Sequence, residues 1–181
     1  MSDVVKRGQA VDLQSEVALS TRVRLARNLT TFPFPASITT EQAAELTLAV
    51  ERVSIDSSEA ILRKMKFRSM KQFLPLDRLA LVEKHLISRE LAKNNRGAVG
   101  IGEGESVAIM VNEEDHLRIQ CLLPGLQIAA AWQIANRIDD ALEAGLPYAF
   151  HNELGYLTAC PTKVGTGMRA SVMLHLPGLV L

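Results

Sequence analysis

The chain has few cysteines and no excess of charge of either sign. Cys121 and Cys160 are its two cysteines among 181 residues. They are too few for a disulfide framework, lack the spacing of a zinc site and favour a reducing compartment. Lysine plus arginine and aspartate plus glutamate number 20 each, which argues against a general binder of nucleic acids or membrane surfaces. Any anion site must therefore come from local clustering of arginines.

Long apolar segments are also missing. No run reaches membrane-spanning length, and Met1 to Ser15 contains no stretch of signal-peptide type, so the cytoplasm is the expected location. With 48% hydrophobic and 22% charged residues, the chain has the composition of one ordered globular domain. It ends inside an apolar stretch, His175 to Leu181. Because terminal residues are usually solvated, we expect a fragment of a longer chain, with a buried final element as the alternative.

Residue patterns predict an α+β domain. Thr39 and Gln42 form a capping-box pattern at the start of one helix, and a second helix runs from Leu126 to about Ala144. Residues 56–74 are basic and poorly periodic, and we interpret them as a loop in which the helical content is left open. Periodicity predicts the other elements: a helix over 76–91 and strands at 17–27, 98–101, 106–111, 117–123, 148–150 and 168–176. Such strand pairs, separated by single helices, predict an antiparallel-rich sheet flanked by helices.

Charge is concentrated in residues 112–118. In an extended chain Glu114, His116 and Arg118 would project to one face, and the two other carboxylates to the opposite face. Such groups beside apolar strands are costly unless a ligand or partner neutralises them. The segment is therefore either a ligand site or a solvated turn with surface ion pairs.

Four arginines lie on predicted strands, namely Arg22, Arg24, Arg118 and Arg169. Arginine offers a rigid fork of donors that suits phosphate oxygens. Several arginines that converge on one triphosphate could support phosphoryl transfer, which depends on positioning and charge stabilisation. Each could equally be an ordinary surface arginine.

Residues 160–170 combine the thiol of Cys160, a glycine-rich turn and Arg169. A thiolate near a cationic substrate would add negative charge. The alternative is a small buried hydrophobic residue, as most free cysteines are.

Four ordered segments, 19–35, 82–88, 111–125 and 155–181, resemble the motifs of the ATP:guanidino phosphotransferases (phosphagen kinases), in particular of their bacterial protein-arginine kinase branch. The resemblance implies a phosphagen kinase catalytic domain, of which residues 1–181 would form the N-terminal part. The second catalytic carboxylate loop, the last nucleotide contacts and the C-terminal dimerising region would lie beyond Leu181.

The resemblance also implies site residues. Glu114 would be catalytic, because it holds the substrate guanidinium and helps remove its proton, and Cys160 would line the guanidinium pocket. No protein residue is expected to bind a metal, since Mg²⁺ would arrive with ATP. The expected nucleotide-binding residues are Ser20, Thr21, Arg22, Val23, Arg24, His85, Arg118, Arg169, Ala170, Ser171, Val172 and Met173.

The activity implied is ATP-dependent phosphorylation of arginine side chains in proteins. A kinase of a free guanidino compound and a truncated nucleotide-binding pseudokinase remain as alternatives. The resemblance further implies a cytoplasmic role in the stress response, with a small zinc-binding activator protein and a Clp-type protease system as partners.

Two features depart from the family pattern. Lys163 stands where the family usually has asparagine, and a cation there would not favour a guanidinium substrate. Either Lys163 points outward or the local chemistry differs from that of the family. Glu103 and Glu105, in a Gly-Glu-Gly segment, resemble the second carboxylate loop. They precede the 112–118 motif instead of following the strand of Arg169, and we interpret them as part of a hairpin turn.

Overall fold

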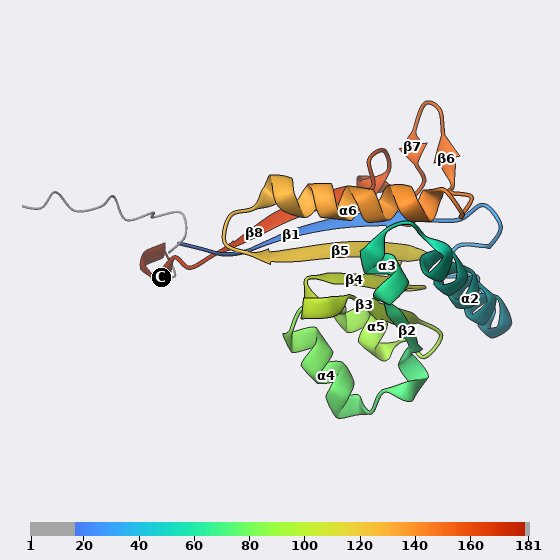
Figure 1. The fold of residues 1–181 in the computed structure, drawn as a ribbon, viewed down its shortest axis with the longest axis horizontal. Helices are drawn as coiled ribbons and strands as arrows, with labels where there is room; N and C mark the ends of the chain where they lie inside the picture. The colour runs from blue at the N-terminus through green and yellow to red at the C-terminus, as the bar shows by residue number, and fades with distance from the viewer. Residues whose placement is uncertain (1–16, 180–181) are drawn as a thin grey trace, which may run out of the picture.

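The computed structural model describes residues 17–179. A six-stranded sheet of order β2-β3-β4-β5-β1-β8 organises them, and every neighbouring pair is antiparallel (Figure 1). Its strands are β1 (Ala18–Arg27), β2 (Lys66–Ser69), β3 (Ala98–Ile101), β4 (Val107–Val111), β5 (Leu117–Pro124) and β8 (Met168–Leu174). A separate hairpin consists of β6 (Phe150–His151) and β7 (Gly155–Tyr156). The predicted antiparallel α+β fold is confirmed.

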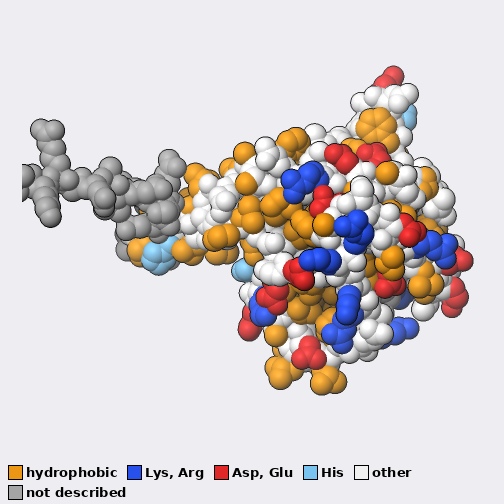
Figure 2. Space-filling view, viewed as in Figure 1, with side chains coloured by type: hydrophobic (Ala, Val, Ile, Leu, Met, Phe, Trp, Pro, Cys, Tyr) orange, Lys and Arg blue, Asp and Glu red, His pale blue; other side chains and the backbone are white. Residues whose placement is uncertain are grey.

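Helices flank this sheet. They are α2 (Thr40–Asp56), α3 (Ala60–Lys64), α4 (Pro75–Glu83), α5 (Arg89–Lys93) and α6 (Ile128–Glu143), with short 3₁₀ turns η1 (Met70–Gln72), η2 (Glu103–Glu105), η3 (Pro161–Lys163) and η4 (Pro177–Leu179). None of the helices in the described range is long and apolar enough to cross a bilayer. Acidic and basic side chains are interspersed over the face drawn in Figure 2, in line with the zero net charge.

Helix α6 covers one face of the sheet at β1 and β5 (Figure 1). Its apolar stripe, Ala131, Ala135, Ile138 and Leu142, repeats at helical spacing and is fully buried. On β1, Val23 and Leu25 are buried in the same core. Because side chains alternate along a strand, Arg22 and Arg24 project from the opposite face, which α6 does not cover.

The capping box of α2 forms as predicted. Thr39 Oγ1 accepts a hydrogen bond from the Gln42 amide at 3.2 Å, and Gln42 Oε1 accepts one from the Thr39 amide at 3.0 Å. Both contacts satisfy amides that the first helical turn leaves free. The helix therefore begins where the sequence indicates.

The interpretation of residues 56–74 as a loop is wrong. The segment contains α3, β2 and η1, and β2 pairs with β3 from Lys66 opposite Ile101 to Ser69 opposite Ala98. Strand β2 has four residues and none is fully buried. Such a short edge strand has no strong hydrophobic pattern, and its pairing with a distant segment is what forms it.

The predicted helix over 76–91 is two helices, α4 and α5, separated at His85. His85 has a left-handed φ of 60°; its amide donates to Val82 O at 2.9 Å, and the Leu86 amide donates to Leu81 O at 2.9 Å. This pair of bonds is the Schellman helix end, and Leu86 is then buried. Periodicity does not reveal the break because the apolar residues continue beyond it.

Boundaries also shift at the C-terminal end. In place of one strand at 148–150, Tyr148 makes an isolated bridge with Leu29, and a new strand, β6, begins at Phe150. The predicted strand 168–176 ends at Leu174 as β8. These short segments take their structure from partners distant in sequence.

Candidate active site

The exposed face of β8, β1 and β5 brings the predicted arginines together. Arg24 lies directly opposite Arg169 in the β1–β8 register, and Arg22 lies opposite Ser171. Arg118 is on β5, the other neighbour of β1. Within residues 17–179, no carboxylate lies at ion-pair distance from Arg22, Arg24 or Arg169.

The arginines of this cluster repel one another and are partly buried. Burial, followed by the nearby charges of Arg22, Arg118 and Arg169, lowers the pKa of Arg24 to about 10. Burial and the charges of Arg118 and Arg169 likewise lower the pKa of Arg22. Arg24 Nε is buried and finds no hydrogen-bond partner in the described structure. The cluster thus has positive charge and donors that an anion could satisfy.

Residues 112–116 form a tight turn, so the common face that an extended chain would give to Glu114, His116 and Arg118 does not form. Asn112 has a φ of 55°, and its amide donates to His116 O at 2.8 Å. The turn buries the His116 ring. Its Nδ1 accepts from the Leu29 amide at 3.0 Å, and Nε2 lies 2.8 Å from Pro33 O.

These contacts define a neutral His116. The Leu29 amide requires an acceptor at Nδ1, and the Pro33 carbonyl requires a donor at Nε2, so one neutral tautomer satisfies both. Burial lowers the pKa of His116, against the raising effects of Pro33 O and Asp115. His116 is therefore a structural support for the turn and does not face the cleft.

Glu113 is buried and fixes Arg118. Glu113 Oε1 accepts from Arg118 Nη1 at 2.9 Å and from Ser88 Oγ at 2.6 Å, while Oε2 accepts from the Glu114 amide at 2.9 Å. Its side chain is 1% exposed. A buried carboxylate with this many donors holds the Arg118 guanidinium in one orientation.

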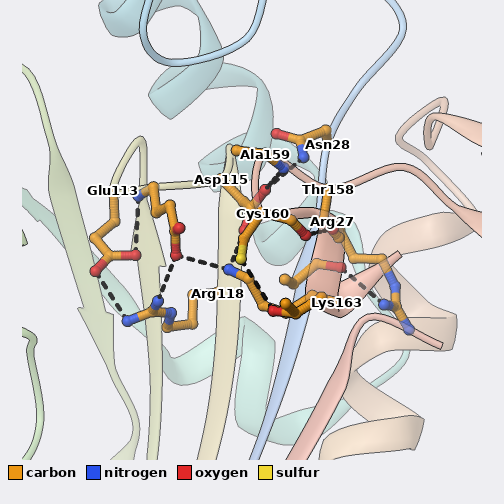
Figure 3. A network of polar contacts seen from close by, with 12 residues as sticks. Arg27, Asn28, Glu113, Asp115, Arg118, Thr158, Ala159, Cys160 and Lys163 are labelled. Atoms are coloured by element: carbon orange, nitrogen blue, oxygen red, sulfur yellow. Dashed lines mark hydrogen bonds and ion pairs between the residues drawn. The ribbon is translucent and has the colours of Figure 1, made fainter. Parts of the chain in front are cut away.

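Glu114 projects into solvent, with a side chain 42% exposed. Its Oε2 accepts from Arg118 Nη2 at 3.3 Å and from Lys163 Nζ at 2.7 Å. The same ammonium contacts Asp115 Oδ2 at 2.8 Å. Figure 3 shows Lys163 directed toward Asp115 and Arg118 directed toward Glu113. The structure therefore places a lysine against the predicted catalytic carboxylate.

Asp115 connects three distant segments. Its Oδ1 accepts from Asn28 Nδ2 at 2.8 Å and from the Ala159 amide at 2.6 Å. Asn28 Oδ1 in turn accepts from the His116 amide at 2.8 Å. The end of β1, the carboxylate turn and the segment before Cys160 are thus held together (Figure 3).

Cys160 is partly exposed beside this turn. Its Sγ lies 3.0 Å from Thr162 Oγ1. The hydrogen bonds of the Thr162 side chain and backbone lower the pKa of the Cys160 thiol, and the charge of Lys163 acts in the same direction. A thiol of this kind is more readily ionised than an ordinary cysteine.

Two adjoining cavities lie over this face. One, of about 410 Å³, includes Arg24, Glu114, Arg118, Cys160, Lys163 and Arg169 in its lining. The other, of about 290 Å³, is lined by Ser20, Arg22, His85, Leu122, Ser171, Val172 and Met173. Both linings include residues of strands β1 and β8, and the two cavities together are called the "cleft" below.

Three predicted nucleotide-binding residues do not line the cleft. Thr21 is fully buried, where its Oγ1 donates to Gly125 O at 2.7 Å and accepts from the Gln127 amide at 2.9 Å. Val23 belongs to the core. Ala170 is exposed but lines neither cavity. Alternation along β1 explains the first two, because a contiguous motif necessarily includes residues of both faces.

The Gly102–Ser106 segment is the connection between the paired strands β3 and β4. Gly104 has a φ of 75°, and Glu103 and Glu105 form exposed ion pairs with Lys64 and Lys84. Neither glutamate lines the cleft. The interpretation as a hairpin turn is confirmed.

Sequence reasoning assigned no role to Glu113, Asp115 or Asn28. Asp115 and Asn28 act through hydrogen bonds between distant segments, and Glu113 acts through the folded turn that brings it to Ser88 and Arg118. The sequence contains no local signal for these contacts. In the described range, no group of three His, Cys, Asp or Glu side chains could hold a metal ion.

Comparison with known proteins identifies the family. Residues 47–181 match the family model "ATP:guanido phosphotransferase, C-terminal catalytic domain". The chain belongs to this family.

Two curated relatives bear the name protein-arginine kinase. The protein from Pelotomaculum thermopropionicum is 54% identical over 171 residues, which cover 93% of this chain and 48% of that protein. The protein from Brevibacillus brevis is 53% identical over 178 residues, which cover 97% and 49%. The chain thus spans about half the length of these relatives. Among solved structures, the substrate-free duplicated taurocyamine kinase from Schistosoma mansoni matches with a TM-score of 0.80 and 26% identity, over 97% of this chain and 26% of that one.

Proposed function

We propose that this chain takes part in ATP-dependent phosphorylation of arginine side chains in proteins. The observation that carries the proposal is the charge distribution in the cleft. Glu113, Glu114 and Asp115 face two cations, Arg118 and Lys163, which leaves one negative charge. The other end holds Arg22, Arg24 and Arg169, which have no carboxylate partner among the residues that the structure describes. Such a cleft would hold a guanidinium group and a polyphosphate side by side.

Glu114 is the proposed catalytic residue. An arginine side chain stays protonated at neutral pH and is a poor nucleophile. Glu114 would orient one guanidinium nitrogen and accept its proton while that nitrogen forms a bond to the γ-phosphorus and the bond to ADP breaks. Cys160, whose pKa is lowered, would add negative charge on the same side of the pocket.

The arginine cluster would bind the phosphates. Arg24, Arg118 and Arg169 line the same cavity as Glu114, and Arg22 lines the adjoining one with Ser20, His85, Ser171, Val172 and Met173. The triphosphate would therefore lie over Arg24 and Arg169, and the nucleoside over the second cavity. Mg²⁺ would arrive with ATP as part of the substrate.

The half-length match supports a further proposal on domain organisation. Residues 1–181 would be the N-terminal part of a catalytic domain, and a second carboxylate that completes the guanidinium site would lie in the C-terminal part. The proposal also includes a cytoplasmic, stress-linked role with a zinc-binding activator protein and a Clp-type protease as partners, which rests on the motif resemblance alone.

Two alternative functions are compatible with the same site. A kinase of a free guanidino compound would use the same cleft but accept a small substrate. A nucleotide-binding pseudokinase would bind ATP through the arginines and transfer nothing.

One experiment separates these functions. A chain extended to the full length of its relatives is incubated with γ-labelled ATP and either a protein mixture or free arginine, and acid-labile phosphate is measured. We expect label in protein, abolished by Glu114→Gln, and negligible transfer by residues 1–181 alone. Transfer to free arginine only would favour the small-substrate kinase. Nucleotide binding without any transfer would favour the pseudokinase.

A further inference from the structure

Lys163, at the end of η3, occupies the space between two carboxylates. Its Nζ lies 2.7 Å from Glu114 Oε2 and 2.8 Å from Asp115 Oδ2, and its side chain is only 17% exposed. Burial lowers the pKa of Lys163, but the hydrogen bonds to Asp115 and Glu114 outweigh that effect and raise it. The ammonium is therefore charged at neutral pH.

The two oxygens of Glu114 have different surroundings. Oε2 accepts from both Arg118 and Lys163. Oε1 receives no hydrogen bond from any residue in the described part of the chain. A fork of guanidinium donors normally binds both oxygens of a carboxylate. In this cleft Lys163, in addition to Arg118, already binds Glu114 Oε2, which is one of the two oxygens that a guanidinium fork would need.

A purely structural role does not account for the contact with Glu114. Asp115 is buried, and its other oxygen is bound by Asn28 and the Ala159 amide. Pairing of Lys163 with Asp115 would suffice to join η3 to the turn. Lys163 Nζ nevertheless also contacts the exposed Glu114, which needs no partner for burial.

We propose that Lys163 sets the affinity of the cleft for guanidinium groups, as a specificity-determining residue that weakens their binding. The inference rests on the proposed function, because it takes Glu114 as the carboxylate that receives the guanidinium. With Lys163 in place, an incoming guanidinium bonds to Oε1 alone and is repelled by the nearby ammonium. Without the charge at position 163, the carboxylate side of the cleft carries two net negative charges, and Glu114 Oε2 keeps only its 3.3 Å contact with Arg118 Nη2.

The test measures binding of N-acetylarginine amide, whose only charge is the guanidinium, by calorimetry on residues 1–181. Lys163→Gln keeps an N–H donor for Asp115 and removes the charge, and Lys163→Met removes both. We expect Lys163→Gln to bind the probe about tenfold more tightly than the unmodified chain, a modest share of the repulsion between two close charges. Lys163→Arg should restore the original affinity.

Two controls accompany these variants. Lys66→Met removes an exposed lysine on β2 and should leave probe binding unchanged. Glu114→Gln in the Lys163→Gln background should abolish the gain. Thermal unfolding of each variant verifies that it is folded. If Lys163→Met is unstable, the probe affinity of Lys163→Gln alone decides the test.

Equal or weaker probe binding in Lys163→Gln would overturn the inference, as would tighter binding that survives Glu114→Gln. Phosphoryl transfer is assayed separately on the extended chain. If Lys163→Gln gains affinity but no variant transfers phosphate, the inference stands and the proposed kinase activity fails.

Discussion

Arg24 and Arg169 lie directly opposite each other on the paired strands β1 and β8, and neither has a carboxylate partner within residues 17–179. Like charges directly opposite on neighbouring strands destabilise a sheet. Repulsion between the two guanidinium groups therefore lowers the stability of the free protein, and a bound anion would reduce that repulsion.

We predict that Arg24→Met weakens ATP binding without lowering thermal stability. Loss of one charge-assisted hydrogen bond, about 1.5–3 kcal/mol, weakens binding roughly tenfold or more. The free protein loses a source of repulsion and an unpartnered buried Nε. Calorimetric titration with ATP and a thermal melt measure the two effects.

The matched control is Arg52→Met, which removes an exposed arginine on α2 and should change neither quantity. If Arg24→Met retains full ATP affinity, Arg24 does not contact the phosphates.

A second prediction concerns acid stability. The pKa of His116 is lowered in the folded protein by burial, whereas the unfolded chain has an ordinary histidine value of about 6.5. Below that value the unfolded state binds more protons than the folded state. The contribution of His116 to stability is therefore complete above the ordinary histidine pKa, and it is lost as the pH falls toward the lowered pKa of the folded protein. Denaturant unfolding at several pH values should show this decline.

His116→Asn keeps an acceptor for the Leu29 amide and cannot titrate. Its unfolding free energy should be lower than that of the unmodified chain at neutral pH, with a shallower decline on acidification. An identical pH dependence in both proteins would contradict the assignment of a neutral, buried His116.

The third prediction distinguishes the two cysteines. Burial raises the pKa of Cys121 to about 11, while hydrogen bonds from Thr162 lower that of Cys160. An alkylating reagent at neutral pH should therefore modify Cys160 first, because the thiolate is the reactive form. Mass spectrometry of the alkylated chain identifies the site.

Thr162→Val removes the hydroxyl that contacts Cys160 Sγ. The pH profile of Cys160 alkylation should then shift to higher pH. An unshifted profile would mean that the Thr162 hydroxyl does not stabilise the thiolate.

Local patterns predicted the elements that pack against the main core. Strand β1 and helix α6 have clear periodicity, because their buried residues recur at the spacing of a strand or a helix. Strands β3 and β4 are short apolar segments whose residues are almost all buried. The short strand β2 and the helix break at His85 depend on pairing or on a left-handed residue. Neither leaves a hydrophobic pattern in the sequence.

Only part of the site was predicted, because the rest also depends on contacts between distant residues. The arginines share a face because β1 alternates, and this follows from the sequence. The turn at residues 112–116 does not, because its geometry depends on Asn28 and on contacts of His116 with Leu29 and Pro33. The ion pair between Lys163 and Glu114 likewise joins residues 49 positions apart.

The network around Asp115 has a consequence for folding kinetics. Its bond to Asn28 joins residues 87 positions apart, and its bond to Ala159 joins residues 44 positions apart. Contacts of such separation require the closure of long loops, which slows their formation relative to local structure. The cleft should therefore be completed late, after helices α2 and α6 have formed. Nucleotide binding would then report on the fully folded chain, since a collapsed intermediate would contain the arginines but not their arrangement.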